Sequence, residues 1–170
     1  MRARASRGFT VIEMMLTIAV LGILLGLALP NFTRWVNNTK IRTAAEAISS
    51  GLQLARTEAV RRNVNVQFVL TGMTGWQVST VATVETIQTR SANEGSSATS
   101  VTVTPAGATT VTFDGLGRVV PNADASAAVA QVVVDALNIT DARRLTILVG
   151  SGGTVRMCDS GIPAPDPRAC

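Results

Sequence analysis

The chain has 170 residues, of which 46% are hydrophobic, and a formal net charge of +4, with no histidine and no tyrosine. The lack of histidine excludes catalysis that depends on an imidazole base. If the first sixty or so residues form a leader and a helix, about 110 residues remain, which suffices for one small domain.

The positive charge suggests nucleic-acid binding, because basic surfaces release counterions from phosphate backbones. Its location argues against that interpretation. Arg2, Arg4 and Arg7 precede a long apolar run, and removal of residues 1–8 as a leader leaves twelve basic and eleven acidic residues, a net charge of +1. The mature protein is therefore expected to be almost neutral.

Residues 9–32 form an apolar run whose single charged residue is Glu13. At ~1.5 Å per residue, a helix of this length spans the ~30 Å hydrocarbon core of a bilayer. The three leader arginines have no acidic partner, so they favour an N-terminus in the cytoplasm and export of the rest. The sequence predicts a transmembrane helix here. A secretory signal cut near Ala28 and an uncleaved anchor are the competing explanations.

Pro30 lies inside this helix, where it removes one backbone hydrogen bond, and Gly22 and Gly26 lie upstream of it. We expect a bend or a weak stretch at this point. One interpretation is a tolerated transmembrane proline. The other is a stretch that melts or straightens when subunits pack into a fibre.

Residues 33–62 are predicted to continue the helix, because apolar residues recur there at steps of four and three. Glu46 follows Arg42, and Arg62 follows Glu58, at the i,i+4 spacing of ion pairs on a solvated face. The predicted buried face consists of Ile41, Ala45, Ile48, Leu52, Ala55 and Ala59. An alternative function for the solvated face is a ligand patch of Arg56, Arg61 and Arg62.

After Asn63 the hydrophobic period changes from 3.6 to 2, which indicates β-strands in a domain over residues 63–170. The fold class is therefore α+β: a long N-terminal helix, transmembrane in its N-terminal half, packed on a small antiparallel β-sheet domain. Ser91–Ser100 is predicted to be a surface loop. Strands are predicted over residues 64–70, 76–81, 101–103, 111–113, 129–134, 145–149 and 154–157.

The run from Arg7 through Gly8, Phe9 and Glu13 resembles the type III signal of type IV pilins and type II secretion pseudopilins. The resemblance implies cleavage by a prepilin peptidase after Gly8 and N-methylation of Phe9. It also implies that the apolar helix remains as the assembly helix. A carboxylate inside a bilayer is costly unless it snorkels, protonates or finds a partner. In this family the equivalent glutamate meets the new amine of a neighbouring subunit. A Glu13 that snorkels to the interface, or that the helix dipole favours, is the alternative explanation.

The helix from Thr43 to Arg62, together with Trp76 and Phe113-Asp114-Gly115, is similar to the GspH/FimT branch of these proteins. This similarity implies a minor pilin that assembles into, or at the tip of, a type IV pilus. The implied partners are the major pilin, other minor pilins and the inner-membrane assembly platform. The implied location is a single pass in the inner membrane with a periplasmic domain, then the filament. A pseudopilin of a type II secretion system is the alternative.

Cys158 and Cys170 are the two cysteines of the chain. An even pair on the exported side of a membrane suggests a disulfide, because metal sites need more ligands. The bridge would close a loop of about thirteen residues, worth roughly 3 kcal/mol in the chain-entropy model. Within the branch, such a bridge argues against the secretion member.

Minor pilins of the FimT type carry a glycine-arginine-x-arginine motif that contacts DNA, and Gly153 to Arg156 resembles it with Thr154 in place of the first arginine. Two guanidinium groups would clamp phosphate better than one. The candidate DNA contacts are Arg143, Arg144, Arg156 and Arg168. Local pairing with acidic residues is the competing interpretation of these arginines.

No catalytic, cofactor-binding or metal-binding residues are expected. No group of acidic residues has the spacing of metal ligands. Gly150 to Gly153 is glycine-rich, but it lacks the lysine and the following helix of a phosphate-binding loop. A tight turn between strands explains it better.

Overall fold

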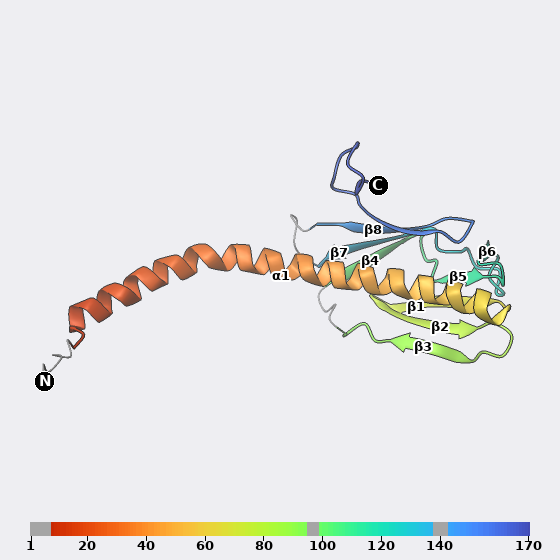
Figure 1. Cartoon of the computed structure of the whole chain (residues 1–170), viewed down its shortest axis with the longest axis horizontal. Coiled ribbons are helices and arrows are strands. Elements are labelled where there is room, and N and C mark those ends of the chain that lie inside the picture. Colours follow the sequence, from red (N-terminus) through yellow and green to blue (C-terminus); the bar gives the residue numbers. More distant parts are fainter. Residues whose placement is uncertain (1–7, 95–98, 138–142) are drawn as a thin grey trace, which may run out of the picture. The chain divides into compact units, whose positions relative to one another are not determined.

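A computed structural model describes residues 8–94, 99–137 and 143–170, apart from the side chains of residues 28, 30 and 31. The chain forms two compact units, residues 1–36 and 37–170. Helix α1, Val11–Arg62, contributes to both units (Figure 1). The predicted continuation of the helix to Arg62 is confirmed.

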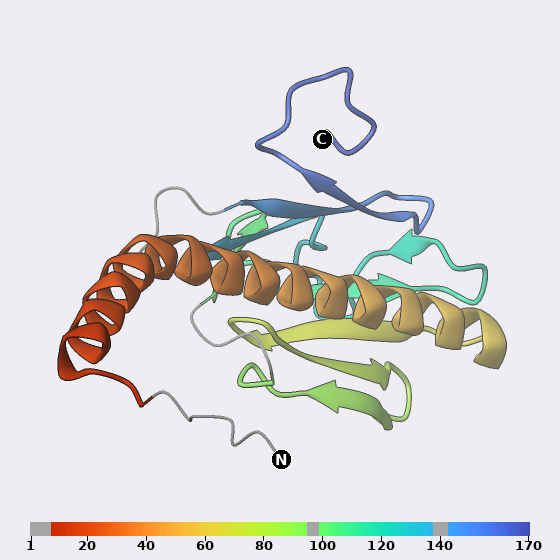
Figure 2. The ribbon, with the colours of Figure 1, turned by 60° about the vertical axis from the view of Figure 1, so that its left-hand side comes forward.

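The second unit contains two antiparallel sheets beside α1 (Figure 2). In the first sheet the strand order is β3-β2-β1-β5-β6. Its strands are β1 (Val66–Gly72), β2 (Gly75–Thr80), β3 (Thr86–Arg90), β5 (Thr110–Phe113) and β6 (Val119–Val120). In the second sheet the order is β4-β7-β8-β9. Its strands are β4 (Thr99–Thr104), β7 (Gln131–Ala136), β8 (Leu145–Val149) and β9 (Val155–Asp159).

The apolar face of α1 and the inner faces of both sheets share one core. All six helix residues predicted to be buried are completely buried. The pattern missed Gly51, whose lack of a side chain makes room for two aromatic rings. A Cβ atom there would lie 2.8 Å from ring atoms of Phe68 and Trp76. The two rings pack together with centroids 5.8 Å apart.

Several strand predictions need correction. Strands β3 and β6 were not predicted, because both are short, lie at sheet edges and lack a completely buried residue. The predicted loop Ser91–Ser100 is wrong at its end. Thr99 and Ser100 belong to β4, where Thr99 pairs with Ala136 and is buried. Residues 95–98 of that loop lie outside the described residues.

β7 begins at Gln131, two residues later than predicted, because Val129 and Ala130 connect the sheets. The amide of Val129 donates to the carbonyl of Thr110 in the first sheet at 3.0 Å. The amide of Ala130 donates to the carbonyl of Thr104 in the second sheet at 2.8 Å. The backbone of this segment therefore hydrogen-bonds to one strand of each sheet.

A junction of three residues, Arg56, Gly117 and Gly153, joins the helix to a turn of each sheet. The Arg56 Nε donates to the carbonyl of Gly117, between β5 and β6, at 3.1 Å. Gly153, between β8 and β9, packs against the same carbonyl. Both glycines have positive φ, +75° and +79°. We refer to this contact as the Arg56 junction.

The Arg56 junction predicts that Gly153→Ala destabilises the domain. The new methyl group would collide with the Gly117 carbonyl oxygen, and the positive φ disfavours any L side chain. We expect a loss of about 2 kcal/mol or more in the free energy of unfolding, measured by denaturant titration. Gly152→Ala is the matched control, because nothing lies within 4 Å of its Cβ position. Equal stability of the two variants would contradict the prediction.

The C-terminal turn of α1 carries an ion-pair cluster around Glu58. Its carboxylate accepts from Arg61 Nη2 at 2.6 Å and from Arg62 Nε at 2.8 Å. Arg62 also reaches Glu85, between β2 and β3, at 3.1 Å. The predicted pairs Glu58–Arg62 and Arg42–Glu46 are both present. With Arg56 on Gly117, the arginines of the proposed ligand patch all have partners within the chain.

The hydrogen bonds from Arg61 and then Arg62 lower the pKa of Glu58 from 4.5 to about 2. A depressed folded-state pKa adds stability above pH 4.5, and this stability is lost as the pH falls toward 2. Glu58→Gln should therefore be less stable than the wild type at pH 7. The difference should shrink between pH 5 and pH 2 in pH-dependent unfolding titrations, and a pH-independent difference would contradict this assignment.

Candidate functional site

Gly8 is the first residue that the structure describes, Phe9 is exposed, and α1 starts two residues after Phe9. Thr10 caps the helix, because its Oγ1 accepts from the Glu13 amide at 3.3 Å. Thr10 and Glu13 have the spacing of a capping box, a signal that sequence reasoning missed. Glu13 therefore lies in the first turn, where the helix dipole favours a carboxylate.

The first unit exposes its large apolar side chains, from Phe9 to Trp35. The helix is long and apolar enough to cross a membrane, judged by length and composition. Its most apolar stretch has no buried residue, unlike the core helix of a soluble domain. The segment therefore presents an apolar surface that its own unit does not cover.

Glu13 is exposed, and none of the residues that the structure describes forms an ion pair with it. α1 continues through Pro30 without interruption of its helical assignment. The weak stretch expected at Pro30 stays a prediction.

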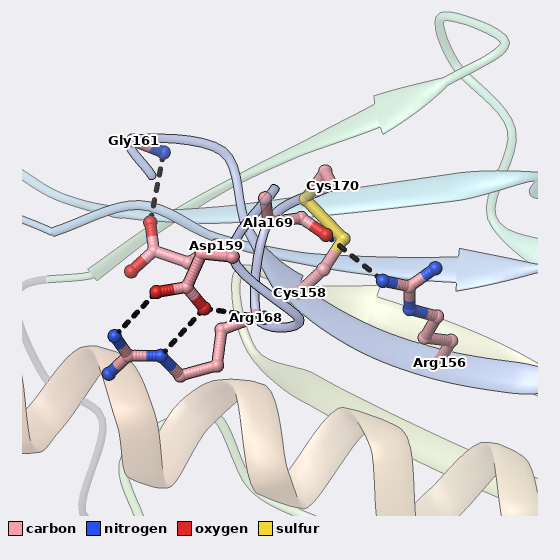
Figure 3. The surroundings of a disulfide bond; sticks show 8 residues. Arg156, Cys158, Asp159, Gly161, Arg168, Ala169 and Cys170 are labelled. Carbon is pink, nitrogen blue, oxygen red and sulfur yellow. Dashed lines mark hydrogen bonds and ion pairs between the residues drawn. A yellow bond between two sulfur atoms is a disulfide. The ribbon is translucent and has the colours of Figure 1, made fainter. Parts of the chain in front are cut away.

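The C-terminal tail is closed by a disulfide between Cys158 and Cys170, with Cα atoms 5.1 Å apart (Figure 3). The predicted bridge is confirmed. The tail returns along β9, the edge strand of the second sheet. The Asp159 amide donates to the Arg168 carbonyl at 2.7 Å, and Asp159 forms a parallel bridge with Ala169. The disulfide and these backbone contacts cover the end of β9.

Asp159 organises the base of the tail, although sequence reasoning did not single it out. Its side chain is 3% exposed and pairs with Arg143. Its Oδ1 also accepts from the Gly161 amide at 2.9 Å, which fixes the turn after β9 (Figure 3). The Arg143 amide donates to Asn38 Oδ1 of α1 at 3.2 Å. Asp159 thus connects the tail to Arg143, just before β8, and Arg143 in turn contacts Asn38 of α1.

The four candidate DNA-contacting arginines all have partners within the chain. Arg143 pairs with Asp159, Arg144 with Asp135 at 2.8 Å, and Arg168 with Asp166 at 2.8 Å. Arg156 donates to the Ala169 carbonyl at 3.0 Å (Figure 3). Three of these partners lie at the closed tail, whereas Asp135 belongs to β7. The arrangement favours local pairing over a free cationic patch.

Hydrogen bonds from Arg168 lower the pKa of Asp166 to about 2, and the charge of Arg143 contributes a smaller part. The guanidinium groups of Arg143 and Arg168 therefore act on the same stretch of tail. Gly153, the glycine of the suggested DNA motif, is required by the Arg56 junction. The Arg56 junction explains the glycine at position 153 without DNA binding.

Metal chemistry has no visible site in the described part of the chain. No group of three or more His, Cys, Asp or Glu residues there is arranged to hold an ion. The two cysteines are consumed by the disulfide. The features with functional potential are thus the exposed apolar helix with Glu13 and the closed tail.

A long helix that is apolar and exposed at its start, and is packed farther along on antiparallel sheets, defines the class of pilin-like subunits. The fold is similar to that of the type IV minor pilin FimU from Pseudomonas aeruginosa PAO1 in two crystal forms. The first has a TM-score of 0.58 at 17% identity and covers 73% of this chain and 92% of FimU. The second has a TM-score of 0.53 at 17% identity and covers 72% of this chain and 97% of FimU.

Residues 44–153, more than half of the chain, match the family described as type II transport protein GspH. The chain belongs to this family. Residues 3–29 match the prokaryotic N-terminal methylation motif. The pilin-like protein PilA1 of Thermus thermophilus is 39% identical over 72 residues, which are 41% of this chain and 45% of PilA1. The chain thus spans less than half the length of that relative.

The tail contacts predict different costs for two neighbouring arginines. Arg143→Ala leaves the buried Asp159 carboxylate without its cation. Arg144→Ala removes the cation from Asp135, whose side chain is 27% exposed and can be solvated by water. Because Arg143 is itself half exposed, we expect about 1–3 kcal/mol of destabilisation for Arg143→Ala. Arg144→Ala should lower the free energy of unfolding by no more than ~1 kcal/mol. Denaturant titration of both variants checks the order, and equal losses would contradict it.

Proposed function

We propose that this chain is a minor-pilin subunit that assembles through its N-terminal helix into, or at the tip of, a type IV pilus. The prepilin peptidase cuts after Gly8, and Phe9 becomes the N-methylated first residue. Before assembly, residues 9–32 cross the inner membrane once and the domain lies in the periplasm. The observation that carries the proposal is the exposed apolar helix with a lone carboxylate one turn from its capped start.

Assembly follows from the need to cover this apolar surface outside the bilayer. Burial of apolar area contributes roughly 25 cal/mol per Å², so packing against neighbouring helices can replace contact with lipid. Glu13 needs a cation once water and headgroups are excluded. Cleavage supplies one, because it creates an amine at Phe9 of each subunit. An ion pair between Glu13 and the amine of a neighbour would also fix the axial register.

The major pilin, other minor pilins and the inner-membrane assembly platform are the partners that this proposal requires. A pseudopilin of a type II secretion system is the second candidate, and the description of the matched family favours it. The disulfide-closed tail supports the pilus instead, on the pattern within the GspH/FimT branch. Identifying the pilin-like subunits that crosslink to the chain in cells would separate the two.

DNA contact stays a prediction. A DNA phosphate would have to displace the partners of Arg143, Arg144, Arg156 and Arg168, which are three carboxylates and one backbone carbonyl. The loss of these intramolecular bonds would offset part of the gain from counterion release. The structure thus offers no preformed clamp within the described residues, and the assembly proposal does not depend on DNA.

The assembly proposal predicts that Glu13→Gln separates processing from incorporation. Glu13 lies several residues after the cleavage site, so we expect the mature variant still to begin with N-methyl-Phe9, as read by intact mass. Its recovery in sheared filaments should fall at least about tenfold, since loss of a buried charge pair costs several kcal/mol. Glu46→Gln is the matched control, because Glu46 pairs with Arg42 on an exposed surface. Normal incorporation of Glu13→Gln, or a different mature N-terminus, would refute the proposal.

A further inference from the structure

Two large aromatic side chains mark the end of the apolar segment. Phe32 and Trp35 are 60% and 64% exposed, and their ring centroids lie 6.0 Å apart. They are three residues apart on α1, so they lie on the same side of the helix. Arg34 lies between them in the sequence and ends the uncharged run that follows Glu13. The pair ends a continuous run of exposed apolar side chains, and such a surface is typical of a membrane or protein interaction site.

We infer that the Phe32–Trp35 pair is an interfacial anchor that binds the lipid headgroup region on the side of the C-terminal domain. Tryptophan is enriched at membrane interfaces because its ring is apolar and its N–H needs a polar partner. Arg34 adds a positive charge at the same level of the helix, as is common at membrane interfaces. The inference rests on the membrane-resident stage of the proposed function and adds the ligand class that fixes the depth of the helix.

Helix length supports this position. From Val11, where α1 begins, to Phe32 there are 21 steps, or ~32 Å at ~1.5 Å per residue. The hydrocarbon core of a bilayer is ~30 Å thick, with the headgroups beyond it. If Phe32 lies at one boundary of the core, the start of α1 lies at the other. Trp35 is then one turn outside the core, within the headgroup region.

The anchor also sets the position of Glu13. Nineteen steps separate Glu13 from Phe32, which is ~28 Å along the helix. With the aromatic pair at one interface, the carboxylate reaches the opposite one, where it stays hydrated. Before assembly Glu13 therefore has little desolvation cost, and Gly8 and Phe9 lie at the membrane surface, accessible to a processing enzyme. The cost arises when the subunit leaves the bilayer, and the neighbouring amine then meets it.

Fluorescence quenching can test the depth of Trp35, because the chain has two tryptophans and Trp76 is buried in the domain. Trp76→Phe leaves Trp35 as the sole emitter. This change keeps an aromatic ring beside Phe68 and removes an indole N–H that is buried without a partner. The full chain is placed in phosphatidylcholine–phosphatidylglycerol vesicles that carry nitroxides on the headgroup, shallow in the acyl chain or deep within it.

We expect the headgroup and shallow labels to quench Trp35 most and the deep label least. The matched control is Trp35→Phe, in which Trp76 should show no dependence on label depth. Strongest quenching by the deep label would overturn the inference. Full quenching of Trp35 by aqueous iodide, with no quenching by any lipid label, would also overturn it. Burial of Trp35 against a second chain would overturn it as well.

A second measurement tests the position of Glu13. The native cysteines are joined in a disulfide, so Glu13→Cys provides a unique thiol. A membrane-impermeant maleimide present on both faces should label Glu13→Cys but not Leu21→Cys, which lies near the middle of the segment. Equal labelling, or none at Glu13→Cys, would overturn the inference. If the chain fails to float with the vesicles, the membrane stage of the proposed function fails instead, so the two failures are distinguishable.

Discussion

The fold depends on how closely two sheets can approach a single helix. The buried face of α1 in the second unit is dominated by small residues, with Ala44, Ala45, Ala55 and Ala59 completely buried and Gly51 against the Phe68 and Trp76 rings. Small side chains let strands of both sheets contribute to one core with the helix. The Arg56 junction then fixes a turn of each sheet to the end of this face. Close packing and the Arg56 junction thus hold both sheets against the same face of α1.

The sequence predicted the helix well because its two halves have different, strong patterns. A run of 24 residues with one charge and a 3.6-residue apolar period both leave clear signals. The six residues of the predicted buried face were all correct. Edge strands left weaker signals: β3 has no buried residue, and β6 has only two residues. Their existence depends on pairing with β2 and β5 rather than on their own composition.

Site residues were predictable where the chemistry is local. The Cys158–Cys170 bridge followed from the cysteine count and the expected export. The capping residue Thr10 was equally readable, since it stands three residues before Glu13. Asp159 was not, because its importance depends on burial beside Arg143, sixteen positions away. Gly153 was assigned to a DNA motif on its neighbours in sequence, whereas its position is explained by the Gly117 carbonyl from a different sheet.

One helix in this chain must satisfy two environments, and its charges are distributed accordingly. The arginines at the end of α1 and in the closed tail have carboxylate or carbonyl partners within the domain. Glu13 differs from them, as an exposed carboxylate that the described residues leave without a cation. Within the described residues, neither the apolar segment nor the domain supplies a cation to Glu13. In the proposed function that carboxylate meets water and headgroups first, and the amine of another subunit afterwards.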